Sequence, residues 1–80
     1  MNYQQHLALA LVALGEGDLD GALAGLNAAL AEAGRLDPEG PRVAEVCSYL
    51  AQVQIQAGRT EDARATQARV DAIWARFPEL

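Results

Sequence analysis

The 80-residue chain has no lysine, one cysteine and only four aromatic side chains, Tyr3, Tyr49, Trp74 and Phe77. A single cysteine cannot form an internal disulfide, and no cysteine–histidine cluster suggests structural zinc. A chain this short allows one domain, residues 1–80, which buries only about 60% of its unfolded surface. Its stability must therefore come from very regular helix packing or from association with another chain.

Long apolar runs and an excess of positive charge are also missing. The longest apolar run, residues 7–14, is too short to span a bilayer and lacks the flanks of a signal peptide, so we expect no membrane association and a cytoplasmic location. Residues 1–40 carry six acids and one arginine, a net charge of −5, whereas residues 41–80 carry five of each. An acidic half repels phosphate backbones, which argues against nucleic acid as a partner and weakly favours a basic protein surface.

Alanine and leucine dominate the composition, and helix start and stop signals predict four helices. The first is expected over residues 2–15 and is ended by Gly15 and Gly17, because glycine tolerates the left-handed conformation at a helix C-terminus. Asp18 is expected to cap the second helix, which ends near Gly34.

The third and fourth helices follow a rigid joint that contains two prolines. Pro38 and Pro41 each push the preceding residue away from helical geometry, so no helix can run through the joint. Pro41 suits the first position of the third helix, which Gly58 is expected to end. Thr60 is expected to cap the fourth helix, and Pro78 is expected to close it.

An internal repeat relates the two halves of the chain. Residues 7–23 and 48–64 align at an offset of 41 positions. The identical pairs are Leu9/Leu50, Ala10/Ala51, Val12/Val53, Gly17/Gly58 and Ala22/Ala63. They fall in a helix body, at a turn glycine and at a small residue of the next helix, where a close helix crossing needs a small side chain.

This pattern resembles two tetratricopeptide repeats, each a helix–turn–helix. That family has a leucine followed by glycine or alanine, then a glycine at the helix end and an alanine five residues later. The matching residues are Leu9, Ala10, Gly17 and Ala22 in one copy and Leu50, Ala51, Gly58 and Ala63 in the other. The resemblance implies an all-α fold of four antiparallel helices, a short right-handed α-solenoid with repeats over about residues 2–36 and 41–78.

The repeat length and the joint resemble the longer, kinesin-light-chain type of repeat. Leu36, Pro38, Pro41, Val43 and Ala44 match the joint of that type, whereas Asp37 and Gly40 depart from it.

The resemblance also implies a concave face, lined by the first helix of each repeat, that holds extended peptides or partner helices. Carried over by position, its partner-binding residues are Gln4, Leu7, Leu11, Leu14, Glu45, Ser48, Gln52 and Ile55. The lysine and asparagine that grip a peptide's C-terminal carboxylate in some members are absent. An apolar or amphipathic partner helix is therefore favoured over a free C-terminus.

No residue pattern predicts catalysis, a cofactor or a metal. Cys47 and His6 occupy equivalent positions and could be imagined as a nucleophile–base pair, but no third group or electropositive surrounding supports this, and we expect packing roles. The acids at the predicted helix starts are explained by the helix dipole. The arginines of the fourth helix alternate with acids, which predicts a solvated, partly paired face.

The sequence thus predicts a protein-interaction module, not an enzyme, that binds a protein or peptide partner through an apolar concave face. The alternative is a structural unit that forms a homodimer or higher oligomer through the same apolar surface. The choice between these two functions depends on residues 7–14, because this segment is apolar on every side of the predicted helix. Either the other helices cover them, or they form an exposed face for a partner or a second copy. A small enzyme or ligand-binding bundle ranks last.

Overall fold

A computed structural model of the protein describes residues 2–77. Its helices are α1 (Tyr3–Gly15), α2 (Leu19–Leu36), α3 (Pro41–Gln56) and α4 (Thr60–Ala75). No strand occurs within residues 2–77, so the predicted all-α fold is confirmed. The expected closure of the last helix by Pro78 lies outside the described residues.

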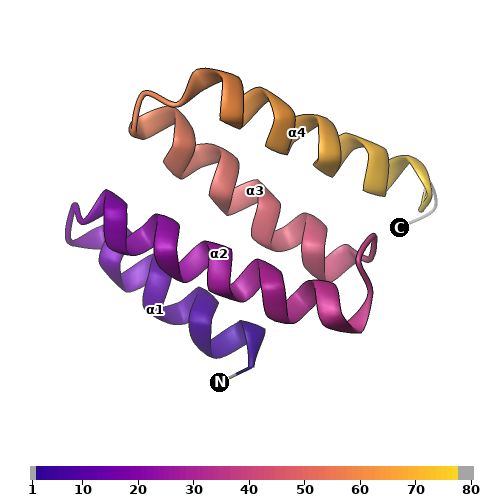
Figure 1. Ribbon diagram of the computed structural model, residues 1–80, viewed down its shortest axis with the longest axis horizontal. Coiled ribbons are helices and arrows are strands. Elements are labelled where there is room, and N and C mark those ends of the chain that lie inside the picture. Colours follow the sequence, from indigo (N-terminus) through magenta and orange to yellow (C-terminus); the bar gives the residue numbers. More distant parts are fainter. Residues whose placement is uncertain (1, 78–80) are drawn as a thin grey trace.

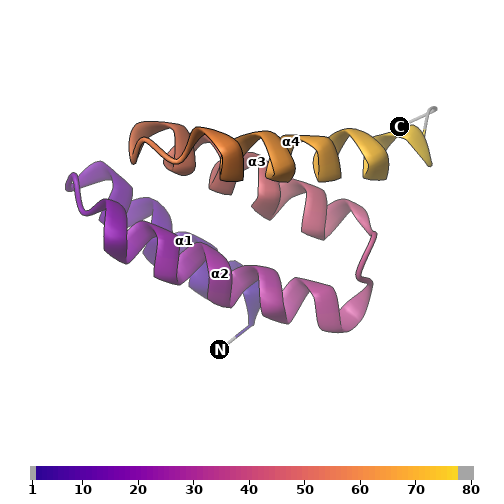
Figure 2. The same ribbon diagram turned by 45° about the horizontal axis from the view of Figure 1, so that its top comes forward.

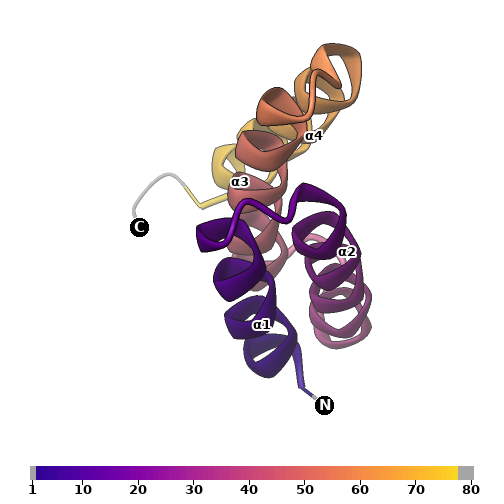
Figure 3. The same cartoon turned by 90° about the vertical axis from the view of Figure 1, so that its left-hand side faces the viewer.

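Each helix runs antiparallel to the next one and packs against it, so that α1 contacts α2, α2 contacts α3 and α3 contacts α4 (Figures 1 and 2). Viewed along the helices, α1 and α2 form one pair and α3 and α4 form a second pair stacked on it (Figure 3). As a result α3 has a helix on both sides, whereas α1 packs mainly on α2.

The core consists mainly of alanine, valine and leucine side chains, and small residues stand where helices cross. Ala22, Ala29 and Ala33 of α2 are completely buried, and Ala10 of α1 is 1% exposed. A Cβ atom placed on Gly25 of α2 would lie 2.8 Å from Cβ of Ala10 and 3.1 Å from its Cα. The backbones of α1 and α2 therefore approach so closely at this crossing that a side chain at position 25 would require a shift of Ala10.

The caps at the helix starts agree with the sequence in part. Asn2 caps α1 in a reciprocal pair with Gln5, each side chain accepting from the other's backbone N–H at 2.9 Å. Asp18 caps α2 as predicted, and its carboxylate accepts from the N–H of Gly21 at 2.9 Å. The prediction that Thr60 caps α4 is wrong: Arg59 is the N-cap, without a side-chain hydrogen bond.

The turns between paired helices explain why Arg59, and not Thr60, is the N-cap of α4. Gly17 and Gly58 both adopt the left-handed conformation, with φ of 79° and 78°. In both turns the N–H of the next residue donates to a carbonyl five residues earlier, at 2.9 Å in the first turn and 2.7 Å in the second. The two turns are built alike at an offset of 41 residues. Arg59 therefore takes the place of Asp18, although threonine is the better capping residue.

The end of α2 lies two residues beyond the expected Gly34. The helix continues to Leu36, and Arg35 pairs with Glu32 across its last turn at 3.3 Å. Asp37, which precedes Pro38, is extended, with φ of −160° and ψ of 105°. The proline and not the glycine ends this helix, because it excludes helical geometry from the residue before it.

Side chains within the joint hold its shape. The carboxylate of Asp37 accepts a hydrogen bond from the backbone N–H of Glu39 at 3.2 Å. The same carboxylate fills the space beside Gly40, where an added Cβ would lie 2.7 Å from its Oδ2 atom. Asp37 and Gly40 are the two positions at which the joint differs from the kinesin-light-chain type. The absence of a side chain at Gly40 leaves the space that the Asp37 carboxylate occupies.

Two arginines of α4 anchor the joint from outside. Arg69 donates a hydrogen bond to the carbonyl oxygen of Pro38 at 3.3 Å, and Arg76 forms an ion pair with Glu39. Because these contacts join segments more than 30 residues apart, they tie the far end of α4 to the connection between the helix pairs.

The close crossing of α1 and α2 gives a stability prediction with a control in the same helix. We expect Gly25→Ala to lower the free energy of unfolding by about 1–3 kcal/mol, because the new methyl group must push Ala10 away. Gly34→Ala meets nothing within 4 Å, so it should stabilise by about 0.5–1 kcal/mol through helix propensity. Urea unfolding followed by circular dichroism measures both values; a stabilising Gly25→Ala would contradict the close crossing.

Candidate functional site

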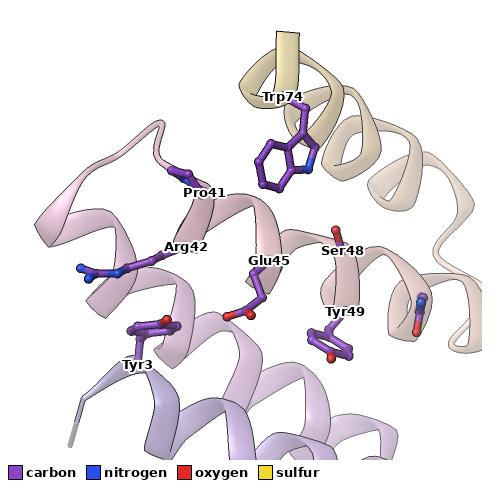
Figure 4. A pocket seen from close by; sticks show the side chains of 8 residues that line it. Tyr3, Pro41, Arg42, Glu45, Ser48, Tyr49 and Trp74 are labelled. Atoms are coloured by element: carbon purple, nitrogen blue, oxygen red, sulfur yellow. The ribbon is translucent and has the colours of Figure 1, made fainter. Parts of the chain in front are cut away.

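A pocket of about 570 Å³ opens between the start of α1, one face of α3 and the last turn of α4 (Figure 4). Its lining residues are Tyr3, Pro41, Arg42, Glu45, Ser48, Tyr49, Gln52 and Trp74. Six of the eight come from α3, which the proline joint starts at Pro41.

The spacing of residues along α3 directs one face into the core and the other into the pocket. Arg42, Glu45, Tyr49 and Gln52 recur every three or four residues, which places them on one side of the helix. The valines and leucine of the opposite side are at most 5% exposed. The packing of α3 between α2 and α4 thus turns its polar stripe outward.

Two charged side chains lie in the pocket without pairing to each other. The guanidinium of Arg42 lies over the ring of Tyr3, 6.0 Å from its centroid, which joins α3 to α1 by a cation–π contact. Glu45 is exposed and forms no ion pair with the side chains of residues 2–77. Its carboxylate points into the space between Tyr3 and Tyr49 (Figure 4).

The remaining side chains supply apolar surface and hydrogen-bond acceptors. Trp74 is 40% exposed and hangs from α4 over α3 (Figure 4), while Tyr3 and Tyr49 are half-buried and pack against the core. The hydroxyl of Ser48 donates to the carbonyl oxygen of Ala44 at 2.9 Å, which leaves its oxygen as an acceptor toward the pocket.

Three of the eight predicted partner-binding residues, Glu45, Ser48 and Gln52, line this pocket. Ile55 lies one turn further along the chain and is 63% exposed outside it. The four predicted residues of α1 do not line the pocket either: Gln4 is exposed, Leu7 and Leu14 pack against the core, and Leu11 is half-buried.

The aromatic side chains of the site and Arg42 are not among the residues predicted from the sequence. Tyr49 follows Glu45 by four residues and precedes Gln52 by three, so helical spacing alone could have found it. Trp74 could not be found in this way, because the family pattern assigns the concave face to the first helix of each pair. It reaches the pocket only because α4 packs back along α3.

The apolar run of α1 is neither fully covered nor fully free. Ala10 is buried, but Leu9 and Val12 are each 58% exposed. Their identical counterparts in α3, Leu50 and Val53, are 5% and 0% exposed. The difference arises because α3 lies between two helices, whereas α1 packs extensively against α2 alone.

The residues considered for catalysis lie apart from the pocket. Cys47 is 1% exposed within the core, as expected for a packing residue. Burial raises the pKa of its thiol above the ordinary 9.0, and the charge of Arg69 offsets part of this effect. Within residues 2–77 no three histidine, cysteine, aspartate or glutamate side chains gather in a group that could hold a metal ion.

The helices of residues 2–77 include none that is both long and apolar enough to cross a membrane.

Comparison with known proteins gives one finding. A family model described as tetratricopeptide repeat matches residues 13–76, which is most of the chain and runs from the last turn of α1 to the end of α4. No curated protein and no solved structure matches the chain.

The buried thiol predicts a pH dependence of stability. Its folded-state pKa is raised, so its contribution is fully present below the unfolded pKa and is lost as pH rises beyond it, because the unfolded thiol ionises first. Between about pH 8 and 10 the free energy of unfolding should fall more steeply in the wild type than in Cys47→Ala, by at most about 1.4 kcal/mol per pH unit. Urea titrations at several pH values measure both slopes. Parallel slopes would contradict this prediction.

Proposed function

The chain belongs to the tetratricopeptide repeat family, whose repeats mediate protein–protein interaction, and on this premise we propose that it binds a partner peptide or helix in the pocket between α1, α3 and α4. The observation that carries the proposal is that Glu45, Ser48 and Gln52, chosen from sequence as partner-binding residues, line one pocket together with Tyr49 and Trp74. Aromatic side chains beside polar groups are typical of protein-binding surfaces.

The same proposal includes the arrangement of the repeats. We take residues 2–36 and 41–78 as two repeats of the longer, kinesin-light-chain-like type. The two turns with left-handed Gly17 and Gly58, built alike at an offset of 41 residues, support this division. The anchored proline joint between α2 and α3 supports the longer type.

A second candidate function is self-assembly, favoured by the exposed face of α1. Leu9 and Val12 are each 58% exposed there, and α1 carries no acidic or basic residue along its thirteen positions other than His6. An uncharged helix in contact with water is unusual in a soluble protein and marks an interaction surface. The identical positions of α3 are buried, so the same side chains are suited to burial against a helix.

The outer side of α4, at the other end of the molecule, is unsuited to cover the exposed face of α1 in a second copy. α2 carries Leu23, Leu26 and Leu30 at the positions where α4 carries Arg64, Gln67 and Asp71. The leucines belong to the core or pack against it, whereas the residues of α4 are exposed. Head-to-tail stacking of copies would bury these charges without partners, which costs free energy. Self-assembly would therefore pair α1 with α1 of a second copy around a two-fold axis.

Panning of a displayed random-peptide library tests the interaction function. We expect the wild type to enrich a related set of peptides, and Ser48→Phe, which fills the pocket, to bind them at least about tenfold more weakly, a loss of about 1.4 kcal/mol. Gln67→Phe on the exposed side of α4 is the matched control and should bind as the wild type does. Equal binding by Ser48→Phe, or no enrichment at all, would refute the pocket as the interaction site.

Light scattering after size-exclusion chromatography, across a wide concentration range, tests self-assembly. If α1 pairs with α1, the wild type should approach twice the chain mass of 8.5 kDa, and Leu9→Gln with Val12→Gln should return it to a monomer. Leu36→Gln, which changes a leucine that is 64% exposed on α2, should leave the dimer intact. A wild type that stays monomeric at every concentration excludes this second function.

A further inference from the structure

We infer that the pocket between α1, α3 and α4 takes the side chain of an arginine or lysine from a basic peptide segment, with Glu45 as its ion-pair partner and Trp74 and Tyr49 as aromatic walls. This inference rests on the proposed interaction function and specifies the partner's chemistry.

Two polar groups of the pocket, those of Glu45 and Ser48, favour a ligand that donates hydrogen bonds. The carboxylate of Glu45 lies at its centre (Figure 4) and has no ion pair with the side chains of residues 2–77. The hydroxyl proton of Ser48 is held by the carbonyl of Ala44, so only the hydroxyl oxygen is free, as an acceptor. An arginine or lysine side chain has several donors and no acceptor, which complements these groups.

The aromatic side chains favour the same ligand. Tyr3, Tyr49 and Trp74 line the pocket from three helices, with Tyr3 and Tyr49 on either side of the Glu45 carboxylate (Figure 4), and the faces of aromatic rings attract cations. One of these rings already has a cation on it, since Arg42 lies 6.0 Å from the centroid of Tyr3. Arg42 occupies the α1 end of the pocket, which leaves Tyr49, beside Glu45, and Trp74, on the α4 side of the pocket, for an incoming cation.

The charge of the whole chain decides between a cationic and an anionic ligand. Arg42 is the one basic residue that lines the pocket, and the ring of Tyr3 engages it. The chain carries a net charge of −5, so its field attracts a basic segment and repels an acidic one. The pocket's carboxylate and the long-range field therefore act in the same direction.

Nuclear magnetic resonance tests the inference with three short peptides. The probes are acetyl-Gly-Gly-Arg-Gly-Gly-amide and the same peptide with citrulline or glutamate in place of arginine. Trp74 is the single tryptophan of the chain, so its indole N–H signal reports on the pocket without ambiguity. We expect the arginine peptide to shift this signal saturably, and the citrulline peptide, which keeps the shape but loses the charge, to bind several-fold more weakly.

Variants of the two charged residues give responses of opposite sign. Glu45→Gln should weaken binding of the arginine peptide about two- to fivefold, as expected for loss of an exposed ion pair. Arg42→Gln should strengthen it by a similar factor, because it removes a like charge. Glu61→Gln, which removes an exposed carboxylate on α4 away from the pocket, is the matched control and should have little effect.

Stronger binding of the glutamate peptide, or equal effects of Glu45→Gln and Glu61→Gln, would overturn the inference. Its failure can be told apart from that of the proposed function. If panning enriches peptides whose binding depends on Ser48, yet the arginine peptide leaves the Trp74 signal unchanged, the interaction function stands and the cation site falls. If the arginine peptide binds as expected but panning enriches nothing, the cation site stands and the proposed interaction function falls.

Discussion

The close approach of helix backbones at small side chains is the constraint on which this structure depends. With four aromatic residues and no disulfide, the chain cannot build a core from large side chains. It brings α1 against α2 where Ala10 faces Gly25, and it buries Ala22, Ala29 and Ala33 completely. Close packing of this kind makes many weak contacts between backbones and methyl groups, which together stabilise a small helical protein.

The joint between α2 and α3 carries that packing from one helix pair to the next. Asp37 and Gly40 fit each other, Pro38 ends α2, and α4 reaches back to hold the joint through Arg69 and Arg76. The pocket depends on this arrangement, because the last turn of α4 and the start of α1 meet the polar face of α3 only when the joint fixes the angle between the pairs. The site is thus a product of the connection as much as of its own residues.

The two ends of the molecule differ in chemistry, and this difference bears on function. α4 ends the stack with a charged and polar outer side, as a solvent-facing helix does, whereas α1 begins it with exposed Leu9 and Val12. The concave pocket and the outer face of α1 lie on different sides of α1. Self-association through α1 would therefore leave the pocket free for a peptide, and the two proposed functions are compatible.

The sequence by itself determined the four helices, the Asp18 cap, the turn glycines Gly17 and Gly58 and the family, because periodicity, caps and turn chemistry are local. It missed the N-cap of α4, where the geometry of the turn overrides the preference for threonine. Of the pocket it supplied Glu45, Ser48 and Gln52 of α3, but not Arg42 or Tyr49, nor Trp74, which reaches them from another helix. Only the tertiary structure decided that Leu9 is exposed while the identical Leu50 is buried. Burial depends on which helix lies alongside, and no local pattern contains that information.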